Sequence, residues 1–243
     1  MPEITKNQLK HIRLLKQKKY RQEFGEFLVE GEKNVDELLK SKFKINAIYA
    51  TSEWNDTNYS ELTTLITVKQ LSQISNLSSP NKVVALAQIP KTEYNESILQ
   101  NDLTLVLDTI NDPGNLGTII RTADWFGIEN IICSTESVDC YNPKVVQTTK
   151  GSLFNVNIHY QDLPTLLLNT KIKIYGAALD GEEIKKGFIP QKPAVLLMGS
   201  ESHGISEDLE KIITDKILIK QKGKAESLNV AIATSILLYQ FTS

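Results

Sequence analysis

The chain has 243 residues, of which 41% are hydrophobic and 23% are charged. This composition is typical of a globular protein with a sizeable core, and it excludes a disordered chain, a collagen-like chain and a small disulfide scaffold. The net charge of −2, from 27 Lys and Arg against 29 Asp and Glu, excludes a uniformly basic protein.

Basic residues are concentrated at the start of the chain. Residues 1–21 contain seven Lys and Arg against Glu3 alone, which leaves 20 basic and 28 acidic residues in the rest of the sequence. A basic start on an otherwise acidic chain favours a polyanionic partner. We expect a helix over 5–19, whose charged face is either simply solvated or a contact to nucleic-acid phosphates. Spacing alone favours the solvated face.

The cysteines and histidines point away from a metal site. Cys133 and Cys140 form no CxxC pair, and the histidines lie far apart, so we expect no metal. The cysteine usage fits a reducing compartment. The N-terminal segment lacks the apolar stretch of a signal peptide, and the apolar C-terminal run contains polar residues. We therefore expect a cytoplasmic protein with no membrane span.

Strands and helices alternate in the first part of the chain, which predicts a small α/β domain over 1–93. The elements expected in it are helices at 5–19, 33–40 and 69–75 and strands at 26–30, 45–50, 65–68 and 83–89. A polar, Pro-containing stretch at 89–95 is typical of a linker, and we place the linker at 94–102.

The pattern restarts more strongly after the linker, where a strand at 103–108, a helix at 117–126 and a strand at 130–133 form a βαβ unit. Further elements are expected as strands at 154–158, 172–179, 194–198 and 216–219 and helices at 143–150, 163–168, 206–213 and 228–241. This alternation predicts a mostly parallel open sheet over 103–243 with helices on its faces.

Three loops that follow strands are rich in Gly and polar residues, and in open α/β sheets ligands bind at the carboxyl ends of the strands. The first loop, 111–117, contains Asn115, a candidate helix cap, and leads into the helix that carries Arg121. Arg121 is the sole arginine after residue 21. Arginine binds phosphate or carboxylate with two parallel hydrogen bonds, which Lys does poorly. Taken alone, Arg121 is better explained as an ordinary Arg–Asp ion pair within its helix.

The second loop, 199–204, has two glycines that allow close backbone approach, and Glu201 could bind a hydroxyl or orient Arg121. The third loop, 220–226, leads to Ser227, a candidate N-cap of the last helix, and to Asn229, which is placed to face a ligand. A merely capped terminal helix is the alternative for this third loop.

Several enzyme classes lack their motifs in this sequence. The dinucleotide motif GxGxxG and the P-loop GxxxxGK[ST] are absent. A hydrolase that uses Ser202 and His203 is disfavoured, because Glu201 occupies the serine position of a GxSxG motif.

Taken together, the three loops resemble, in order and spacing, the signature motifs of the SpoU (TrmH-like) RNA ribose 2′-O-methyltransferases of the SPOUT superfamily. The motifs are NDPGNLGTIIRTADWFG at 111–127, LLMGSESHGIS at 196–206 and ILIKQKGKAESLNVAIATSILLYQF at 217–241. Residues 21–39 are similar to the small substrate-binding domain found before the catalytic domain, which resembles an RNA-binding ribosomal protein. One departure is Ile219-Lys220-Gln221, where the family has Ile-Pro-Met.

The resemblance implies a SPOUT-type α/β fold whose C-terminal part forms a trefoil knot. It also implies a homodimer that uses the helix of the first motif and the last helix. The implied cofactor is S-adenosylmethionine, and the implied donor-binding residues are Leu197, Met198, Gly199, Gly204, Ile217, Ile219, Ser227 and Leu228.

The implied reaction is methylation of a ribose 2′-hydroxyl in RNA, with ribosomal RNA as the first expectation and transfer RNA as the second. The implied catalytic residues are Arg121, Asn115, Glu201, Ser227 and Asn229. Arg121 acts either as a general base or as a clamp on the adjacent phosphate, and we favour the clamp because a guanidinium is hard to deprotonate.

An RNA substrate also changes the interpretation of the basic N-terminal helix. Contacts to RNA phosphates are then expected from Lys16, Lys18, Lys19 and Arg21, in addition to Arg121. The alternative from a different class is a non-catalytic RNA-binding protein that has kept the fold.

Overall fold

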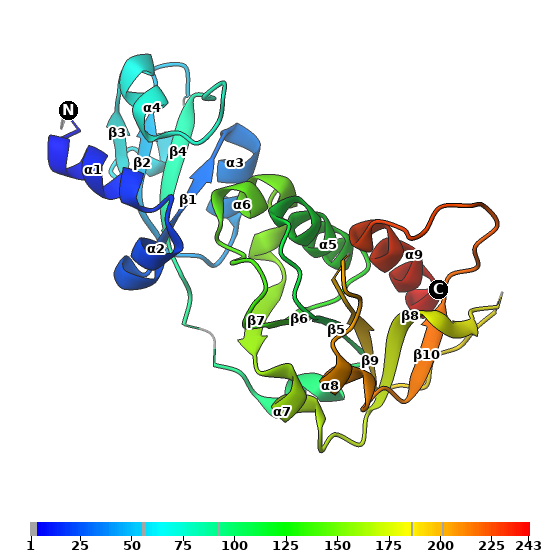
Figure 1. Cartoon of the computed structure of the whole chain (residues 1–243). Helices are drawn as coiled ribbons and strands as arrows, with labels where there is room; N and C mark the ends of the chain where they lie inside the picture. Colours follow the sequence, from blue (N-terminus) through cyan, green and yellow to red (C-terminus); the bar gives the residue numbers. More distant parts are fainter. Residues whose placement is uncertain (1–3, 55–56, 92, 186, 201) are drawn as a thin grey trace. The chain divides into compact units, whose positions relative to one another are not determined.

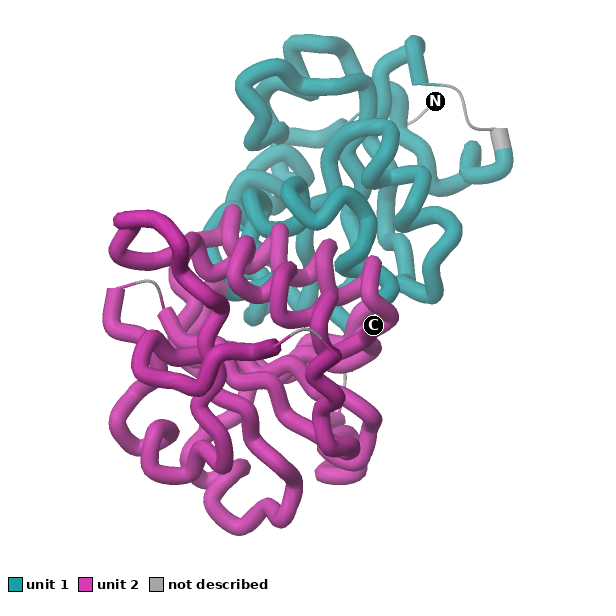
Figure 2. Tube along the Cα trace, turned by 90° about the vertical axis from the view of Figure 1, so that its right-hand side faces the viewer, with its two compact units in different colours: residues 1–91, 139–155 teal, residues 92–138, 156–243 magenta. Residues whose placement is uncertain are grey.

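The computed structural model describes residues 4–54, 57–91, 93–185, 187–200 and 202–243. The chain divides into two compact units, shown in different colours in Figure 2. Unit 1 comprises residues 1–91 and 139–155, and unit 2 comprises residues 92–138 and 156–243. The segment 139–155 therefore packs with the first part of the chain, which the sequence pattern does not indicate.

Unit 1 is built on a sheet with the strand order β1-β4-β2-β3 (Figure 1). The strands are β1 (Glu26–Glu30), β2 (Ile45–Ala50), β3 (Thr63–Leu65) and β4 (Val83–Gln88). The helices are α1 (Lys6–Leu14), α2 (Lys18–Phe24), α3 (Glu32–Lys40), α4 (Val68–Ile74) and α6 (Pro143–Thr149), with 3-10 turns η1 (Thr57–Tyr59) and η3 (Ser152–Phe154). β4 pairs antiparallel with β1 and β2, and β3 runs parallel to β2. The predicted α/β character of this part of the chain is confirmed.

The helix predicted over 5–19 is in fact two helices. α1 starts at a capping box between Thr5 and Gln8, and α2 begins at Lys18. At the break, the Arg21 guanidinium donates to the carbonyl oxygens of Leu15 and Lys16 at 2.8 and 3.0 Å. These carbonyls lie at the end of α1 and would otherwise lack a partner, so Arg21 stabilises the break.

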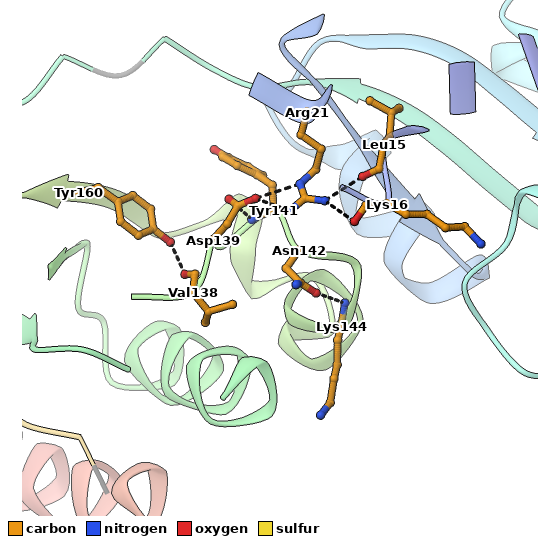
Figure 3. Close-up of polar contacts among 9 residues, drawn as sticks. All are labelled: Leu15, Lys16, Arg21, Val138, Asp139, Tyr141, Asn142, Lys144 and Tyr160. Carbon is orange, nitrogen blue, oxygen red and sulfur yellow. Dashed lines mark hydrogen bonds and ion pairs between the residues drawn. The ribbon is translucent and has the colours of Figure 1, made fainter. Parts of the chain in front are cut away.

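Arg21 is also paired with Asp139, the first residue of the segment 139–155 (Figure 3). The Arg21 side chain is 2% exposed, and its Nε and Nη2 both donate to Asp139 Oδ2, at 2.9 and 2.6 Å. The prediction that Arg21 contacts RNA phosphates is therefore wrong, because its guanidinium is buried and its donors are occupied within the fold.

Aromatic packing also holds the segment 139–155 in unit 1. The rings of Phe27 and Tyr141 lie 4.6 Å apart, and Phe43 meets Phe154 edge-on at 5.2 Å. Such pairs stabilise by more than their buried area alone. The segment is thus part of the core of unit 1.

Unit 2 contains a sheet with the strand order β10-β8-β9-β5-β6-β7, and each of its pairings is parallel (Figure 1). The strands are β5 (Leu103–Leu107), β6 (Asn130–Ser134), β7 (Asn157–Gln161), β8 (Lys173–Glu183), β9 (Ala194–Met198) and β10 (Asp215–Leu218). The predicted parallel sheet is confirmed. The strand expected at 154–158 starts later, because residues 152–154 form η3.

The helices of unit 2 lie on both faces of this sheet. They are α5 (Pro113–Trp125), α7 (Leu163–Leu167), α8 (Glu207–Glu210) and α9 (Val230–Thr242), with the 3-10 turn η2 (Glu96–Gln100). α5 and α9 pack against each other on one side of the sheet, and α7 and α8 lie on the other side (Figure 1). Within the described ranges, no helix has both the length and the apolar character needed to cross a membrane.

The buried Arg21–Asp139 pair generates a stability prediction. Asp139→Ala leaves the Arg21 charge buried without its partner, and we expect a loss of about 3 kcal/mol in the free energy of unfolding. Chemical denaturation followed by circular dichroism measures this loss. The matched control is Asp208→Ala, which removes an exposed i,i+3 pair with Lys211 and should cost at most about 1 kcal/mol. Equal losses in the two variants would contradict a structural role for the buried pair.

Candidate active site

The loops that carry the three motifs leave the same edge of the unit 2 sheet. The first follows β5, the second follows β9 and the third follows β10. Because these strands are parallel, their carboxyl ends share one edge. In open α/β sheets this is the edge at which ligands bind.

Asp108 ties two of these loops together. It follows β5, it is buried, and its Oδ2 accepts a hydrogen bond from the backbone N–H of Ser206 at 2.8 Å. Its own N–H donates to the carbonyl oxygen of Met198 at 2.8 Å. Sequence reasoning missed this residue, although an acid that ends the apolar run LTLVL is a usable signal.

The helix of the first motif begins earlier than predicted. α5 starts at Pro113, and its N-cap is Asp112, whose side chain accepts from the N–H of Asn115 at 2.8 Å. The prediction that Asn115 caps this helix is therefore wrong. Proline suits the first helical position and moves the start upstream. Asn115 lies in the first turn, where its side chain contacts Asn229 and does not cap the helix.

The last helix begins later than predicted. α9 starts at Val230, and its N-cap is Asn229, whose Oδ1 accepts from the N–H groups of Ala231 and Ile232 at 3.0 and 3.3 Å. The prediction of Ser227 as the cap is therefore wrong. Ser227 lies in the exposed loop before the helix.

Asn229 also joins the first and third motifs. Its Nδ2 donates to the Oδ1 of Asn115 at 2.9 Å. Since its Oδ1 caps α9, both ends of the amide are engaged and its orientation is set. The structure thus brings together two of the predicted catalytic residues, which are 114 positions apart in sequence.

Arg121 is exposed and lies about two turns into α5. Six residues separate it from Asn115, which places the two about 120° apart around the helix axis. Its neighbour one turn on is Trp125, whose side chain is 85% exposed. Arg121 and Trp125 therefore share an outward side of α5 that differs from the side of Asn115. The predicted catalytic residue Glu201 lies outside the described residues.

The second loop folds back sharply at its glycines. Ser200 and Gly204 exchange backbone hydrogen bonds of 2.9 and 3.0 Å. A Cβ atom on Gly199 would lie 2.1 Å from the backbone carbon of Gly204, so only glycine fits there. The loop also brings Ser202 Oγ to 2.8 Å from His203 Nδ1 on an exposed turn.

A cavity of about 860 Å³ lies elsewhere in unit 2 and is lined by residues such as Tyr94, Asp162 and Lys171. Burial raises the pKa of the Tyr94 hydroxyl, which has no hydrogen-bond partner among the described residues. None of the motif residues lines this cavity. Because no motif residue lines it, this cavity is not the candidate active site, despite its volume.

The three motifs lie almost wholly in a part of the chain that matches a known family model. The model of the SpoU rRNA methylase family matches residues 102–239. The chain belongs to this family. A second model, that of the MRM3-like substrate-binding domain, matches residues 6–85. The alternative of a Ser202–His203 hydrolase is not supported by this membership.

Relatives of this SpoU family member align with almost its whole length. It is 33% identical over 248 residues to the 23S rRNA (guanosine(2553)-2′-O)-methyltransferase RlmP of Bacillus subtilis, covering 98% of this chain and 97% of the relative. A TrmH-family protein from Porphyromonas gingivalis has a similar structure, with a TM-score of 0.87, 35% identity and coverage of 99% and 98% of the two chains.

An AdoMet-bound rRNA methyltransferase from Sinorhizobium meliloti is also similar in structure, with a TM-score of 0.84 and 30% identity. The alignment covers 99% of this chain and 95% of the S. meliloti chain.

The residues that the SpoU motifs assign to the donor differ in exposure. The side chains of Leu197, Met198 and Ile217 are buried in the sheet. Ile219 is half-buried and Leu228 is exposed. The strand-end side chains therefore belong to the core of unit 2, and Leu228 lies in the exposed loop before α9.

The double role of Asn229 predicts a separation of two effects. Asn229→Ala removes both the cap and the contact to Asn115, and we expect a loss of about 1 kcal/mol in the free energy of unfolding. Asn229→Ser keeps a capping oxygen but is too short to reach Asn115, so most of this stability should return. Chemical denaturation of both variants measures the difference. Equal destabilisation by Ala and Ser would show that the cap contributes nothing.

Proposed function

We propose that this protein transfers a methyl group from S-adenosylmethionine to a ribose 2′-hydroxyl of ribosomal RNA. The observation that carries the proposal is the contact between Asn115 and Asn229, which joins two motifs of the SpoU family at the carboxyl edge of the sheet. The similarity to a 23S rRNA 2′-O-methyltransferase over 98% of the chain supports ribosomal RNA as the substrate.

The edge of the sheet suits a nucleoside-containing methyl donor. The residues that would hold it are Gly199 and Gly204 in the second loop and Ile217, Ile219 and Leu228 in the third. Gly199 lets the backbone of Gly204 approach so closely that a Cβ atom would overlap it, which fixes the turn of the second loop. An adenine ring needs an apolar slot with a few backbone hydrogen bonds, and Met198, which ends β9, and Ile217, next to the end of β10, are apolar. When bound, S-adenosylmethionine supplies an activated methyl group.

Arg121 acts on the acceptor side in this proposal. A ribose hydroxyl is too weak an acid to ionise at neutral pH, so the site must stabilise the negative charge that develops on its oxygen. A guanidinium retains its charge and can bind an adjacent phosphate through two hydrogen bonds. The exposed position of Arg121 on α5 leaves it accessible to RNA. Glu201 would orient Arg121 or the ribose, and Asn115, on another side of α5, would orient the ribose. Ser227 and Asn229 would fix the third loop and contact the site.

The trefoil knot is part of the proposal. The strand order supports it, since the chain leaves β9, passes β8 to form β10 at the edge and then returns to α9, which packs on α5. The loops 199–206 and 219–229 would form the crossings that hold the donor.

We also propose that the protein acts as a homodimer through α5 and α9. Exposed apolar side chains recur on α9 at Ile232, Ile236 and Tyr239, a spacing that places them along one face. Trp125, on the neighbouring helix α5, is also exposed. An exposed apolar stripe of this kind is typical of a subunit contact, and symmetric pairing would bury it. Arg121 shares the side of Trp125, which would place it near the interface.

The catalytic role of Arg121 is tested by Arg121→Ala. We expect loss of methyl transfer to unmodified ribosomal RNA by at least about 100-fold, with the affinity for S-adenosylmethionine unchanged, because the guanidinium acts on the acceptor. Transfer of labelled methyl groups and calorimetric titration of the donor measure the two quantities. Label that appears in transfer RNA instead would overturn the substrate, and unchanged turnover would overturn the role of Arg121.

The dimer is tested by the double variant Ile232→Glu/Tyr239→Glu, which places charges on the apolar stripe. We expect the wild type to elute with twice the 27.3 kDa mass of one chain and the variant with the mass of one chain. Light scattering coupled to gel filtration measures both masses. Ile189→Glu, at an exposed position outside the stripe, is the control and should stay dimeric. A dimeric double variant would exclude this face as the interface.

A further inference from the structure

Unit 1 contains a cavity of about 420 Å³ that takes its lining from two distant parts of the sequence. Asn142, Lys144 and Gln147 come from the segment 139–155, Asn76 comes from the loop after α4, and Lys16 comes from the break between α1 and α2. Its volume lies within the range of small-ligand pockets, about 300–1,000 Å³. No residue of the three motifs lines it.

The amides that line the cavity from α6 are held in one orientation. Asn142 Oδ1 accepts from the N–H of Lys144 at 2.9 Å, as Figure 3 shows. Gln147 Oε1 accepts from Asn34 Nδ2 at 2.8 Å. Because both oxygens are engaged within the fold, each of the two side chains has its NH₂ group to offer a ligand.

The amide of Asn76 is held the other way round, because its NH₂ group is the end that is engaged within the fold. Asn76 Nδ2 donates to Glu30 Oε1 at 2.6 Å, and the N–H of Asn76 also donates to Glu30. Asn76 therefore has its Oδ1 to offer as an acceptor. The buried Glu30 carboxylate accepts from Ser75 Oγ as well, so its oxygens are taken up by the fold.

The exposed charged groups at the cavity are basic, and the buried Glu30 carboxylate, which is hydrogen-bonded within the fold, also lines it. Lys16 and Lys144 both line it and are exposed. Lys16 Nζ donates to the carbonyl oxygen of Ser75 at 3.2 Å, which holds its ammonium beside the loop that carries Asn76. The cavity thus combines ammonium groups, which bind phosphate, with amide donors and an acceptor, which match the edge of a nucleobase.

We propose that this cavity binds one unpaired nucleotide of the RNA substrate, with Lys16 and Lys144 on its phosphates and Asn76, Asn142 and Gln147 on its base. The inference rests on the proposed function, which supplies RNA as the partner. Proteins read RNA sequence mainly in loops and bulges, where a base can turn out of its stack and present its edge. The substrate-binding surface would then include the segment 139–155, beyond the residues 6–85 that match the substrate-binding domain model.

Gln147→Glu tests the contact to the base. The variant keeps an oxygen for Asn34 Nδ2 and the shape of the side chain, and it replaces the offered NH₂ group with a carboxylate oxygen. We expect a rise of about tenfold in KM for an unmodified 23S rRNA transcript of B. subtilis sequence, with kcat and the affinity for S-adenosylmethionine unchanged. Gln88→Glu adds the same charge at an exposed position of β4 outside the cavity and should change KM less than about twofold.

Lys144→Ala tests the contact to phosphate by direct binding of the full-length protein to the same transcript. We expect weaker binding, and a slope of log K against log salt that is shallower by about 0.7, the value for one phosphate contact on a single strand. Lys33→Ala removes an exposed lysine of α3 outside the cavity and should leave the slope unchanged.

The two arms separate this proposal from the proposed function. Wild-type KM in Gln147→Glu together with the wild-type salt slope in Lys144→Ala would overturn the nucleotide site, even if the wild type methylates the transcript. If the wild type methylates no RNA, the proposed function fails, and the salt slope still decides whether the cavity binds RNA. Circular dichroism establishes that each variant is folded, and Lys144→Ala alters an exposed side chain, so its result stands if Gln147→Glu does not fold.

Discussion

A buried guanidinium needs an opposite charge next to it, and Arg21 finds this charge in Asp139. This ion pair holds the segment 139–155 in unit 1, so the way the chain divides into two units depends on it. An uncompensated charge at 2% exposure would cost several kcal/mol, so the two residues must meet in the folded state. Asp139 follows β6 of the second unit and yet belongs to the first. The chain therefore passes from one unit to the other at three points rather than one. The segment that this exchange places in unit 1 also completes its 420 Å³ cavity.

The parallel sheet of unit 2 is the corresponding constraint on the chemistry. Parallel strands bring their carboxyl ends to one edge, so loops far apart in sequence meet there without further design. Specific contacts then refine the edge: Asp108 joins the first and second loops, and Asn229 joins the third to the first. Asp108 and Asn229 each make a second hydrogen bond within the fold, which fixes their positions. Such a site is set before any ligand arrives, which lowers the cost of ordering it on binding.

The sequence predicts most strands well, because their signals are local. β1, β2 and β9 are apolar runs bounded by polar or turn residues, and they occur at the predicted positions. The helix starts at Asp112 and Asn229 were misplaced, because several residues near each start are good caps and only the folded chain selects one. The burial of Arg21 could not be predicted, since its partner lies 118 residues away and the sequence directly before it is rich in Lys. The pairing of Asn115 with Asn229 depends likewise on two distant loops.

The chain has three arginines, at positions 13, 21 and 121, and uses Lys for its other basic positions. Arg13 donates to both the carbonyl and the side-chain oxygen of Gln73, and Arg21 donates to Asp139 and to two carbonyls. Both use the planar fork of donors that Lys lacks. A rare arginine in this chain therefore indicates a contact that needs several donors, and its partner can lie inside the fold or outside it. Exposure distinguishes the two: Arg21 is buried against its own chain, whereas Arg121 is exposed, as is Trp125 one turn on, and its proposed bidentate partner is a phosphate of the RNA.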